Sequence, residues 1–534
     1  MPIDTISFKK AGYFSSLICD YLAETPELKT FYNRFPSINN FRDQIQEKKN
    51  AIEAQTRSIL VNALKKQYLN TDTSELTIQN IELLEKENAF TITTGHQLNL
   101  FTGPLYFLYK IVSALNLSKE LKEKYSNYHF IPVYWMATED HDFDEINYFN
   151  FKGKKIQWNR SAKGAVGELS NEGLEDVFMV LESEFGKSKN ANDLKVLFKK
   201  AYLNHSNLAD ATRFLANELF KEYGLVIIDA NDVELKRLFI PFVKDELLNN
   251  TAFNEVSKTN EQISELAKEQ YQIQVNPREI NLFYLAENLR ERIVFEENSF
   301  KVLNTDINWS LNEIQEELSK HPERFSPNVI MRPLYQEVIL PNLCYIGGGG
   351  ELAYWFQLKA YFEKVEVPFP MLLLRNSVLI KTESQSKKLH KLKISNEDIF
   401  LKRNAFINKK VREISNINID FSEQKAHLQK QFENLYSLAE QTDKSFLGAV
   451  KAQEAKQTNG LNRLEKRLLK AQKKALSDQV SRMTELQNQL FPNGSLQERN
   501  TNFTEFYLEY GEQLIPQLIA HLKPLQGEFL ILTM

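Results

Sequence analysis

Cysteine is scarce in this chain of 534 residues, which contains only Cys19 and Cys344. Two cysteines are too few for a disulfide framework or for a cysteine-rich zinc site. Cys344 stands beside an apolar run, where a buried small side chain is more common than a nucleophile. We therefore expect no zinc and no metal centre built by the protein.

Long hydrophobic runs and an excess of positive charge are also missing. No apolar run reaches the roughly 18 residues that a membrane-spanning helix needs, and the first residues lack the basic region that opens a signal peptide. Lys and Arg number 66 against 70 Asp and Glu, so the net charge of −4 gives no electrostatic case for nucleic-acid binding. We expect a cytoplasmic protein with neither a membrane nor a nucleic-acid partner.

Five short apolar runs end in polar or glycine-containing turns. Each is apolar at successive positions instead of alternating, which is typical of strands buried on both faces of a parallel sheet. Helical patterns separate the runs, and this order predicts a doubly wound α/β core. Functional residues in such sheets gather beyond the carboxyl ends of the strands. The runs are residues 89–95, 129–140, 224–232, 328–334 and 369–377.

Polar segments divide the core pattern. We expect two insertions, because the connections there are much longer than an ordinary crossover needs to be. A C-terminal segment that is again aromatic and apolar is expected to pack back on the core. The core pieces are then 1–150, 217–244 and 328–380, the insertions are 151–216 and 245–327, and the C-terminal segment is 491–534.

A long helical excursion is expected at 381–490, which contains no proline and is rich in Lys, Glu, Gln and Leu. Leu461, Leu464 and Leu468 follow a 3-4 spacing, which predicts a coiled coil or helical hairpin. The segments SFLGAV (445–450) and TNG (458–460) are expected to break its helices. An exposed seam suggests homodimerisation through this coiled coil. The alternative is a solvated arm that packs only on itself.

The first apolar run ends in Thr93-Thr94-Gly95-His96-Gln97, ahead of a helix-forming stretch. A helix N-terminus offers free N–H groups and partial positive charge to an anion such as phosphate. Gly95 would let the backbone approach a ligand, and His96 could donate a hydrogen bond. The alternative is a turn in which Gly95 supplies a positive φ and His96 a polar cap.

The second run ends in an acidic turn that contains Glu139, Asp140, His141 and Asp142. These side chains could hold an amine substrate, bind Mg²⁺ or act as a base. Neighbours on one turn cannot all face one ion, which argues against a complete metal site. The alternative is an acidic loop whose members cap the next helix.

Four consecutive glycines, 347–350, precede Glu351 and an apolar helix. So many glycines are costly in backbone entropy, which favours backbone packed against a ligand. No Gly-Lys-Ser/Thr follows, so this is not a P-loop. Arg332 and Gln336 lie upstream and could help to bind the same ligand. The alternative is a tight connection with Trp355 in the core.

These segments together resemble the cysteine-adding ligases of bacillithiol biosynthesis. The matching pieces, in this order, are TGHQLNLFTGPLYFLYK, PVYWMATEDHDFDEI, RPLYQEVILPNLCYIGGGGELAYWFQLK, LLLRNSV and LQER. The resemblance implies a Rossmann-like core related to class I aminoacyl-tRNA synthetases, with connective-peptide insertions and a coiled coil used in dimerisation. It also implies the last step of the pathway, which joins L-cysteine to glucosaminyl-malate through an amide. ATP is the expected cosubstrate, and Mg²⁺ is a candidate companion ion.

The resemblance also suggests which residues form the site. His96 takes the first place of the H-x-G-H signature of the synthetases, whereas Leu98 and Asn99 replace its glycine and second histidine. Gly349 stands where the family commonly has proline. The candidate catalytic residues are Asp140, His141, Asp142 and His96. The candidates for binding substrate or nucleotide are Thr94, Gly95, Gln97, Asn99, Thr102, Gly103, Glu139, Arg332, Gln336, Gly347, Gly348, Gly349, Gly350, Glu351, Trp355, Arg375 and Asn376.

A function of another class stays open on the sequence alone. A non-catalytic dimeric protein with a synthetase-like fold could keep the small-molecule pocket and use the coiled coil for partners. Substitution of Asp140 or His141 distinguishes the two, because only the enzyme would lose thiol synthesis. RNA binding, by analogy with the synthetases, is disfavoured by the acidic charge balance.

Overall fold

Five parallel strands form the central sheet of the computed structural model, which describes residues 3–267 and 270–534. In sheet order they are β6 (Val226–Asp229), β3 (His129–Met136), β2 (Ala89–His96), β12 (Asn342–Gly347) and β13 (Met371–Leu374). Numbered by their appearance along the chain, this is the Rossmann order 3-2-1-4-5, and all neighbouring pairs are parallel. The Rossmann-like α/β fold class is thus confirmed. The order reverses between β2 and β12, which is where such sheets bind ligands.

The central strands form because both of their faces are covered. All eight residues of β2 and all six of β12 are buried. The threonines of β2 satisfy their hydroxyl groups inside the sheet, since Thr93 donates to the Asn342 side chain at 2.8 Å and Thr94 to the Ile346 carbonyl at 2.8 Å. Cys344 is fully buried, as expected of a small core residue.

The expected strand at 328–334 is wrong, and the fourth strand is β12 instead. The Asn328 side chain accepts the N–H groups of Ile330 and Met331, which starts helix α14 (Met331–Ile339). Pro333 lies in the first turn, where its missing N–H is harmless. The other four apolar runs do contain strands of the sheet.

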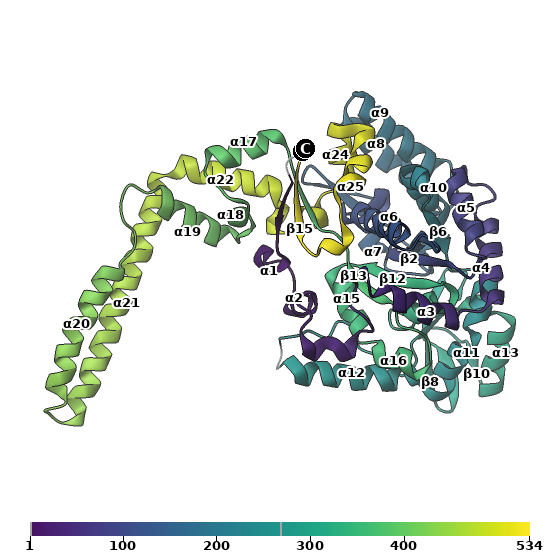
Figure 1. Cartoon of the computed structure of the whole chain (residues 1–534), viewed down its shortest axis with the longest axis horizontal. Coiled ribbons are helices and arrows are strands. Elements are labelled where there is room, and N and C mark those ends of the chain that lie inside the picture. The colour runs from purple at the N-terminus through teal and green to yellow at the C-terminus, as the bar shows by residue number, and fades with distance from the viewer. Residues whose placement is uncertain (1–2, 268–269) are drawn as a thin grey trace.

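Two insertions lie at opposite ends of the body (Figure 1). Between β3 and β6 the chain forms a short helix, a hairpin and three further helices: α7 (Phe143–Ile146), β4 (Tyr148–Phe151), β5 (Lys154–Gln157), α8 (Leu174–Phe185), α9 (Lys189–Phe198) and α10 (Leu208–Phe220). Between β6 and β12 it adds helices around a five-stranded antiparallel sheet. These are α11 (Val233–Asn249), α12 (Thr251–Ala267), β7 (Leu282–Ala286), β8 (Leu289–Glu296), β9 (Ser299–Val302), β10 (Asn308–Trp309), α13 (Leu311–Lys320) and β11 (Phe325–Pro327).

The two ends of the chain meet in a separate three-stranded sheet of order β1-β15-β14. Its strands are β1 (Ile3–Ile6), β14 (Val378–Lys381) and β15 (Phe529–Thr533). The remaining N-terminal helices are α1 (Phe8–Ala11), α2 (Ser16–Leu22), α3 (Phe41–Ala51), α4 (Ala54–Gln67) and α5 (Glu75–Leu83). Helix α6 (Tyr106–Lys124) follows β2, and α15 (Gly349–Phe356) and α16 (Lys359–Lys364) join β12 to β13. The C-terminal helices α23 (Gln497–Asn500), α24 (Phe503–Tyr510) and α25 (Leu514–His521) lie on the body, where α25 contacts α6.

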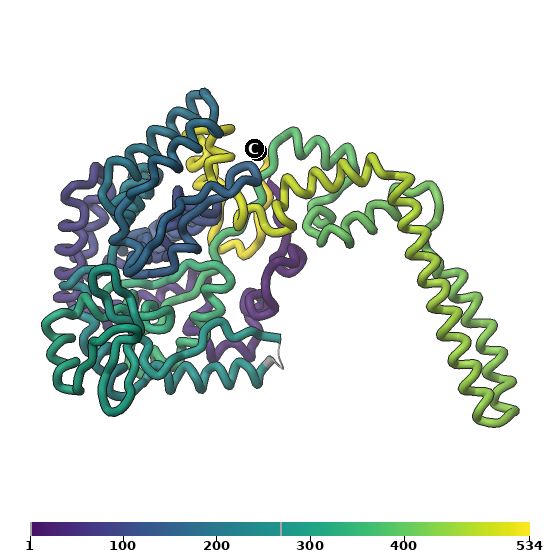
Figure 2. The backbone as a smooth tube through the Cα atoms, turned by 180° about the vertical axis from the view of Figure 1, so that it is seen from behind, coloured from purple at the N-terminus to yellow at the C-terminus, as the bar shows by residue number. Residues whose placement is uncertain are grey.

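An arm of helices projects from the body between β14 and the C-terminal helices (Figures 1 and 2). It contains α17 (Glu383–Lys391), α18 (Asn396–Phe400), α19 (Arg403–Ile414), α20 (Ser422–Ala439), α21 (Lys444–Ala475) and α22 (Ser477–Leu490). Helices α20 and α21 form the distal antiparallel hairpin. The expected breaks at 445–450 and 458–460 are wrong, because α21 runs through both and the turn lies at 440–443. Asp443 caps the start of α21. Gly448 and Gly460 lie at exposed positions inside α21 and do not interrupt it.

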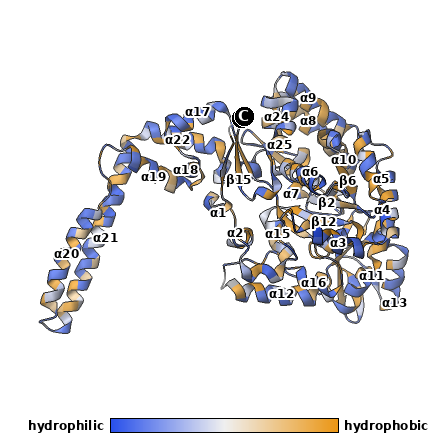
Figure 3. Cartoon of the chain, in the orientation of Figure 1, coloured by the Kyte–Doolittle hydropathy of each residue, from blue (hydrophilic) through white to orange (hydrophobic). Residues whose placement is uncertain are grey.

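Apolar and polar residues alternate along the arm (Figure 3). Phe432, Ala439 and Val450 form a small buried cluster inside the hairpin, separate from the core of the body. Other apolar side chains, such as Leu438 and Leu464, remain more than half exposed at 54% and 52%. Along the described part of the chain, no helix has the length and apolar character needed to cross a membrane.

Because the hairpin is stabilised by its own cluster, we predict that Phe432→Ala opens the arm without affecting the central sheet. Loss of this side chain should cost the hairpin about 3 kcal/mol. Hydrogen exchange should then accelerate in α20 and α21 and stay unchanged in β2 and β3. Asn434→Ala, at an exposed polar position of the same helix, is the matched control. Equal acceleration in the sheet would contradict an independently stabilised arm.

Candidate active site

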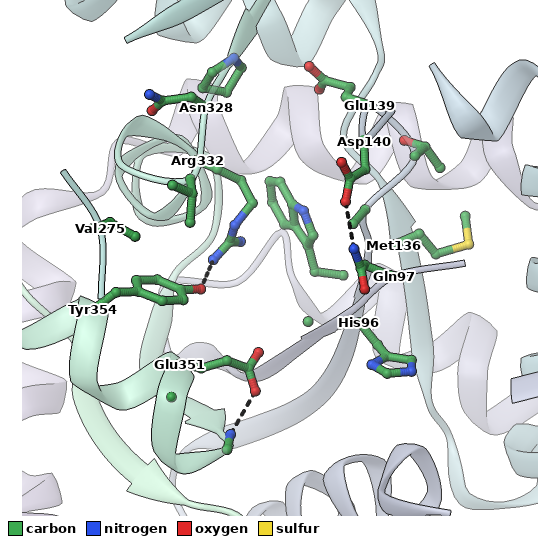
Figure 4. Close-up of a pocket in the computed structure, with 18 of the residues that line it drawn as sticks. His96, Gln97, Met136, Glu139, Asp140, Val275, Asn328, Arg332, Glu351 and Tyr354 are labelled. Carbon is green, nitrogen blue, oxygen red and sulfur yellow. Dashed lines mark hydrogen bonds between the residues drawn. The ribbon is translucent and has the colours of Figure 1, made fainter. Parts of the chain in front are cut away.

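A cavity of about 680 Å³ lies at the carboxyl edge of the central sheet (Figure 4). All five strands of the sheet contribute to it at or just beyond their last residues, from Gly95 of β2 to Arg375 after β13. The antiparallel sheet of the second insertion supplies the facing wall, including Phe283 and Arg290. The cavity therefore occupies the position at which a Rossmann sheet binds its ligand.

The lining is cationic although the chain as a whole is acidic. Six Lys and Arg residues line the cavity against three carboxylates, a balance of +3, whereas the whole chain carries −4. A concave surface of one sign concentrates ions of the opposite sign. The cavity therefore suits an anionic ligand. The cations are Lys110, Arg278, Arg290, Arg332, Arg375 and Arg499, and the carboxylates are Glu139, Asp140 and Glu351.

Helix α15 starts at the cavity within the glycine run. Gly348 is its N-cap, and the Glu351 carboxylate accepts the Gly348 N–H at 2.7 Å. The same carboxylate accepts from Lys110 Nζ at 2.7 Å and from the Tyr345 hydroxyl at 2.9 Å. Burial would raise the pKa of Glu351, but Lys110 and the Gly348 N–H lower it below its ordinary value. Glu351 thus stays ionised and holds the first turn of α15 and Lys110 together.

Three of the four glycines serve two different purposes. A Cβ at Gly347 would meet Tyr345 and Leu352 carbons at 2.9 Å, so this glycine is required by packing. Gly348 and Gly350 line the cavity, and a Cβ there would meet nothing closer than 3.4 Å. The first N–H groups of α15 have no acceptor within their own helix, so a ligand in the cavity could accept from them.

Two arginines face the glycine run. Arg332 of α14 donates to Gln336 Oε1 at 3.1 Å and to the Tyr354 hydroxyl at 3.5 Å (Figure 4). Arg375 Nη2 lies 2.8 Å from Glu498 Oε1. Burial would lower the pKa of Arg375, but Glu498 raises it above its ordinary value. Arg375 Nε is buried and has no hydrogen-bond partner within 3–267 and 270–534, so it remains available to an anion.

The acidic turn after β3 forms the opposite part of the cavity. Asp140 accepts from Gln97 Nε2 at 2.8 Å and from the His141 N–H at 2.7 Å. Burial would raise the pKa of Asp140, but the nearby His141 side chain, the Gln97 amide and the His141 N–H lower it well below its ordinary value. Glu139 pairs with the buried Lys236 at 2.7 Å. Asp140 is therefore an ionised acceptor and a weak base.

His96 is buried beneath the cavity. Its ring packs against Tyr106 and Phe107, with centroids 5.5 and 5.2 Å away. Burial lowers the pKa of His96 well below its ordinary value, and Lys110 lowers it further, so the ring is neutral. Its Nε2 has no hydrogen-bond partner among the residues that the structure describes.

The expected helix start at Thr94 and Gly95 is wrong. Both residues belong to β2 and pair with its neighbours, and α6 begins only at Tyr106. The sequence 97–105 forms an intervening loop, in which the side chain of Asn502 donates to the carbonyls of Phe101 and Gly103. Thr94 faces β12, and Gly95 contributes its backbone to the cavity wall.

The structure brings just over half of the candidate residues to the cavity and places the others elsewhere. Those that line it are Gly95, His96, Gln97, Glu139, Asp140, His141, Arg332, Gly348, Gly350, Glu351 and Arg375. Those outside its lining are Thr94, Asn99, Thr102, Gly103, Asp142, Gln336, Gly347, Gly349, Trp355 and Asn376. Trp355 is fully buried among aromatic rings, and Asp142 caps α7 by accepting the Glu145 N–H. Both arrangements match the structural alternatives that the sequence left open.

Several lining residues were missed by the sequence analysis. Lys110 lies four residues after Tyr106 on α6, so helical spacing could have placed both on one face. Arg278 and Arg290 come from the second insertion, where no local pattern marks them. Arg499 lies in the LQER segment, and Tyr354 three residues after Glu351. In the described part of the chain, no group of three or more His, Cys, Asp or Glu residues is placed to hold a metal ion.

Two family models cover almost the whole chain. The first, "Bacillithiol biosynthesis BshC, N-terminal Rossmann-like domain", matches residues 1–376, and the second, "Bacillithiol biosynthesis BshC, C-terminal coiled-coil domain", matches 378–534. The chain belongs to the BshC family. Curated relatives named as candidate cysteine ligases, BshC, agree along their full length. That of Flavobacterium johnsoniae is 61% identical and covers 100% of both chains. That of Christiangramia forsetii is 58% identical, covering 100% of this chain and 99% of its own.

More distant relatives also match along nearly the whole chain. A protein of Bacillus thuringiensis with the same name is 29% identical, with 97% of each chain covered. One solved structure, of a candidate arginyl-tRNA synthetase from Campylobacter jejuni, is matched at 9% identity over 88% of this chain and 98% of that one. Its TM-score is 0.22, which is too low to bear on the relationship to synthetases.

Both BshC domains build the cavity. Arg375 lies in the Rossmann-like domain, whereas Glu498 and Arg499 come from the coiled-coil domain after the arm has returned. Glu498 also accepts the Val378 N–H at 3.1 Å and the Ser377 hydroxyl at 3.1 Å. The segment that returns to the body after the arm, which contains α23 (Gln497–Asn500), therefore holds Arg375 in place in the cavity wall.

We predict that Glu498→Ala lowers the free energy of unfolding by about 3–5 kcal/mol, because it leaves the buried Arg375 guanidinium unpaired. Urea unfolding followed by circular dichroism measures this change. Glu512→Ala removes an acid that is 72% exposed and should change stability by less than about 0.5 kcal/mol. Similar changes for both variants would show that the Arg375–Glu498 pair does not stabilise the fold.

Proposed function

We propose that this protein is a ligase that joins L-cysteine to glucosaminyl-malate through an amide bond, with ATP as cosubstrate. The observation that carries the proposal is the cationic cavity at the switch point of the sheet, in a chain that belongs to the BshC family. Glucosaminyl-malate contributes the two carboxylates of malate, and ATP contributes a polyphosphate. An anion-attracting cavity fits both ligands.

The chemistry requires activation of the cysteine carboxylate. An amine does not displace an oxide ion from a carboxylate, so one carboxylate oxygen must first become part of a leaving group. Transfer of an adenylyl group from ATP to that oxygen, which releases pyrophosphate, or of a phosphoryl group, which releases ADP, supplies one. The amine nitrogen then bonds to the carboxyl carbon, the C–O bond breaks, and AMP or phosphate leaves with the oxygen of cysteine. The amine proton passes to solvent.

The end of the cavity around α15 is suited to phosphate or carboxylate oxygens. Arg332 and Arg375 both face it, and Arg375 Nε has no partner in the described residues. The free N–H groups at the start of α15 add fixed donors that need no reorganisation. Lys110 stabilises this end of the cavity by pairing with Glu351. A Mg²⁺ ion bound to ATP would be held there by phosphate oxygens and water.

The other end of the cavity is suited to the amine and to the malate carboxylates. Asp140 is ionised and can accept hydrogen bonds from the amino group, which it orients instead of deprotonating. Arg278 and Asn328 lie on the facing wall and can donate to carboxylates. The two ends together would bring amine and activated carboxyl side by side.

The arm supports the proposal that the protein is a homodimer. Exposed apolar residues such as Leu438, Phe446 and Leu464 remain on the hairpin, and a second copy could cover them. Light scattering on the purified protein measures the mass directly. A monomeric mass would favour the alternative of an arm that packs only on itself.

We predict that Asp140→Asn lowers kcat/KM about 10- to 100-fold, because a hydrogen bond to a charged group contributes about 1.5–3 kcal/mol. Amide formation followed by mass spectrometry measures the change. Asp144→Asn is the matched control, since Asp144 is exposed on the same acidic segment. Equal activity of both variants and the natural protein would exclude Asp140 from the site.

The proposed function is tested with the purified protein, L-cysteine, glucosaminyl-malate and ATP. We expect the cysteinyl amide to form with one nucleotide consumed per product. Product that forms without nucleotide consumption would contradict the activation step. No product under any of these conditions, with ligands still bound, would favour the non-catalytic binding protein.

A further inference from the structure

A single contact determines which ring nitrogen of His141 can carry a proton. Arg290 of β8 reaches from the second insertion to the end of β3, and its Nη1 lies 2.6 Å from His141 Nδ1. A guanidinium group remains protonated and can only donate. His141 Nδ1 must therefore accept with its lone pair, and the proton of the neutral ring lies on Nε2.

Other contacts hold this pair in place. Arg290 stacks 3.9 Å from the centroid of Phe283, and the His141 ring lies against the same phenyl ring at 5.4 Å. Asp140 Oδ1 lies 3.6 Å from His141 Nδ1, but the backbone N–H of His141 donates to it at 2.7 Å. Because Arg290 occupies the Nδ1 lone pair, the ring does not donate to Asp140 from that nitrogen.

Charges on the turn after β3 favour the same arrangement, although Lys236 of α11 adds a second cation nearby. Asp140 and Glu139 on the β3 turn attract the Arg290 guanidinium. A second proton on the ring would set two N–H groups against each other at a distance of 2.6 Å. The ring also carries no free lone pair on Nε2 in the neutral form, so His141 cannot accept a proton there while the contact lasts.

We propose that Arg290 is a positioning residue that holds the proton of the neutral His141 ring on Nε2, so that His141 donates a hydrogen bond to the reacting carboxyl oxygen. The identity of that oxygen rests on the proposed function. Negative charge grows on it as the amine attacks, and a donor oriented in advance stabilises that charge. His141 then acts as a donor, not as the base that removes the amine proton, and that proton leaves to solvent.

The tautomer is measured by nitrogen NMR on the full-length protein labelled with ¹⁵N-histidine. His141→Gln identifies the signals of this ring among the eight histidines of the chain. We expect His141 Nδ1 to resonate as an unprotonated nitrogen and Nε2 as a protonated one. Arg290→Met removes the donor but keeps an apolar chain on Phe283, and it should yield a mixture of tautomers. Arg290→Lys restores a donor and should restore the Nε2–H form.

Arg292→Met is the matched control, because Arg292 lies two residues along the same strand and outside the cavity lining. Its spectrum should be that of the natural protein. A natural protein with the proton of His141 on Nδ1, or an Arg290→Met spectrum without change, would overturn the proposal. These spectra do not depend on turnover, so they separate this inference from a failure of the proposed function.

The proposed role of His141 as a donor is tested separately by steady-state kinetics. His141→Ala should lower kcat about 100-fold or more with little change in KM, as expected for a donor that acts in the transition state. Arg290→Met should lower kcat less, and Arg290→Lys should recover part of the loss. An unchanged kcat in His141→Ala, in an enzyme that forms the amide, would overturn the donor role even if the tautomer is as expected.

Discussion

The reversal of strand order between β2 and β12 is the constraint on which the site depends. Parallel strands end at a common edge, and the chain leaves β2 and β12 toward different neighbours, which opens a crevice between their ends. The glycine run in which α15 begins follows β12, which borders this crevice, and the turn after β3 lies one strand beyond β2. The insertions add the outer wall. Residues separated by about 400 positions, such as His96 and Arg499, therefore line the same cavity.

Carboxylates hold several cations of the cavity in place. Glu498 holds Arg375, Glu351 holds Lys110, and Asp140 lies close to the His141–Arg290 pair. Each buried pair costs desolvation energy that its own contacts must offset. The result is a set of donors whose directions are fixed by the protein itself, as expected of a site that stabilises developing charge. Because Glu498 belongs to the return segment of the arm, the two BshC domains are parts of one site.

Local sequence patterns were sufficient for the core and for part of the site. Unbroken apolar runs correctly indicated four buried strands, since such strands need no alternation. The segment at 328–334 has the same apolar character, but the cap provided by Asn328 makes it the start of a helix. Trp355 shows a similar limit, because an aromatic residue in the first turns of a helix can face either a ligand or the core.

Residues that reach the cavity from distant segments carried no such signal. Arg278 and Arg290 enter through a second insertion whose packing against the β3 turn depends on tertiary contacts. The pairing of Arg375 with Glu498 spans 123 positions, and neither residue marks the other in the sequence. Polar turns at the strand ends were predictable because their place in the fold follows from the strands. The residues that contact these turns from distant segments were not predictable in this way.

We propose that this cationic crevice activates the carboxylate of cysteine for attack by an amine. It is tested most directly with cysteine labelled with ¹⁸O in its carboxylate. If the account is right, each amide formed transfers one ¹⁸O atom to AMP or to phosphate. Amide formed with no ¹⁸O in either product would contradict it.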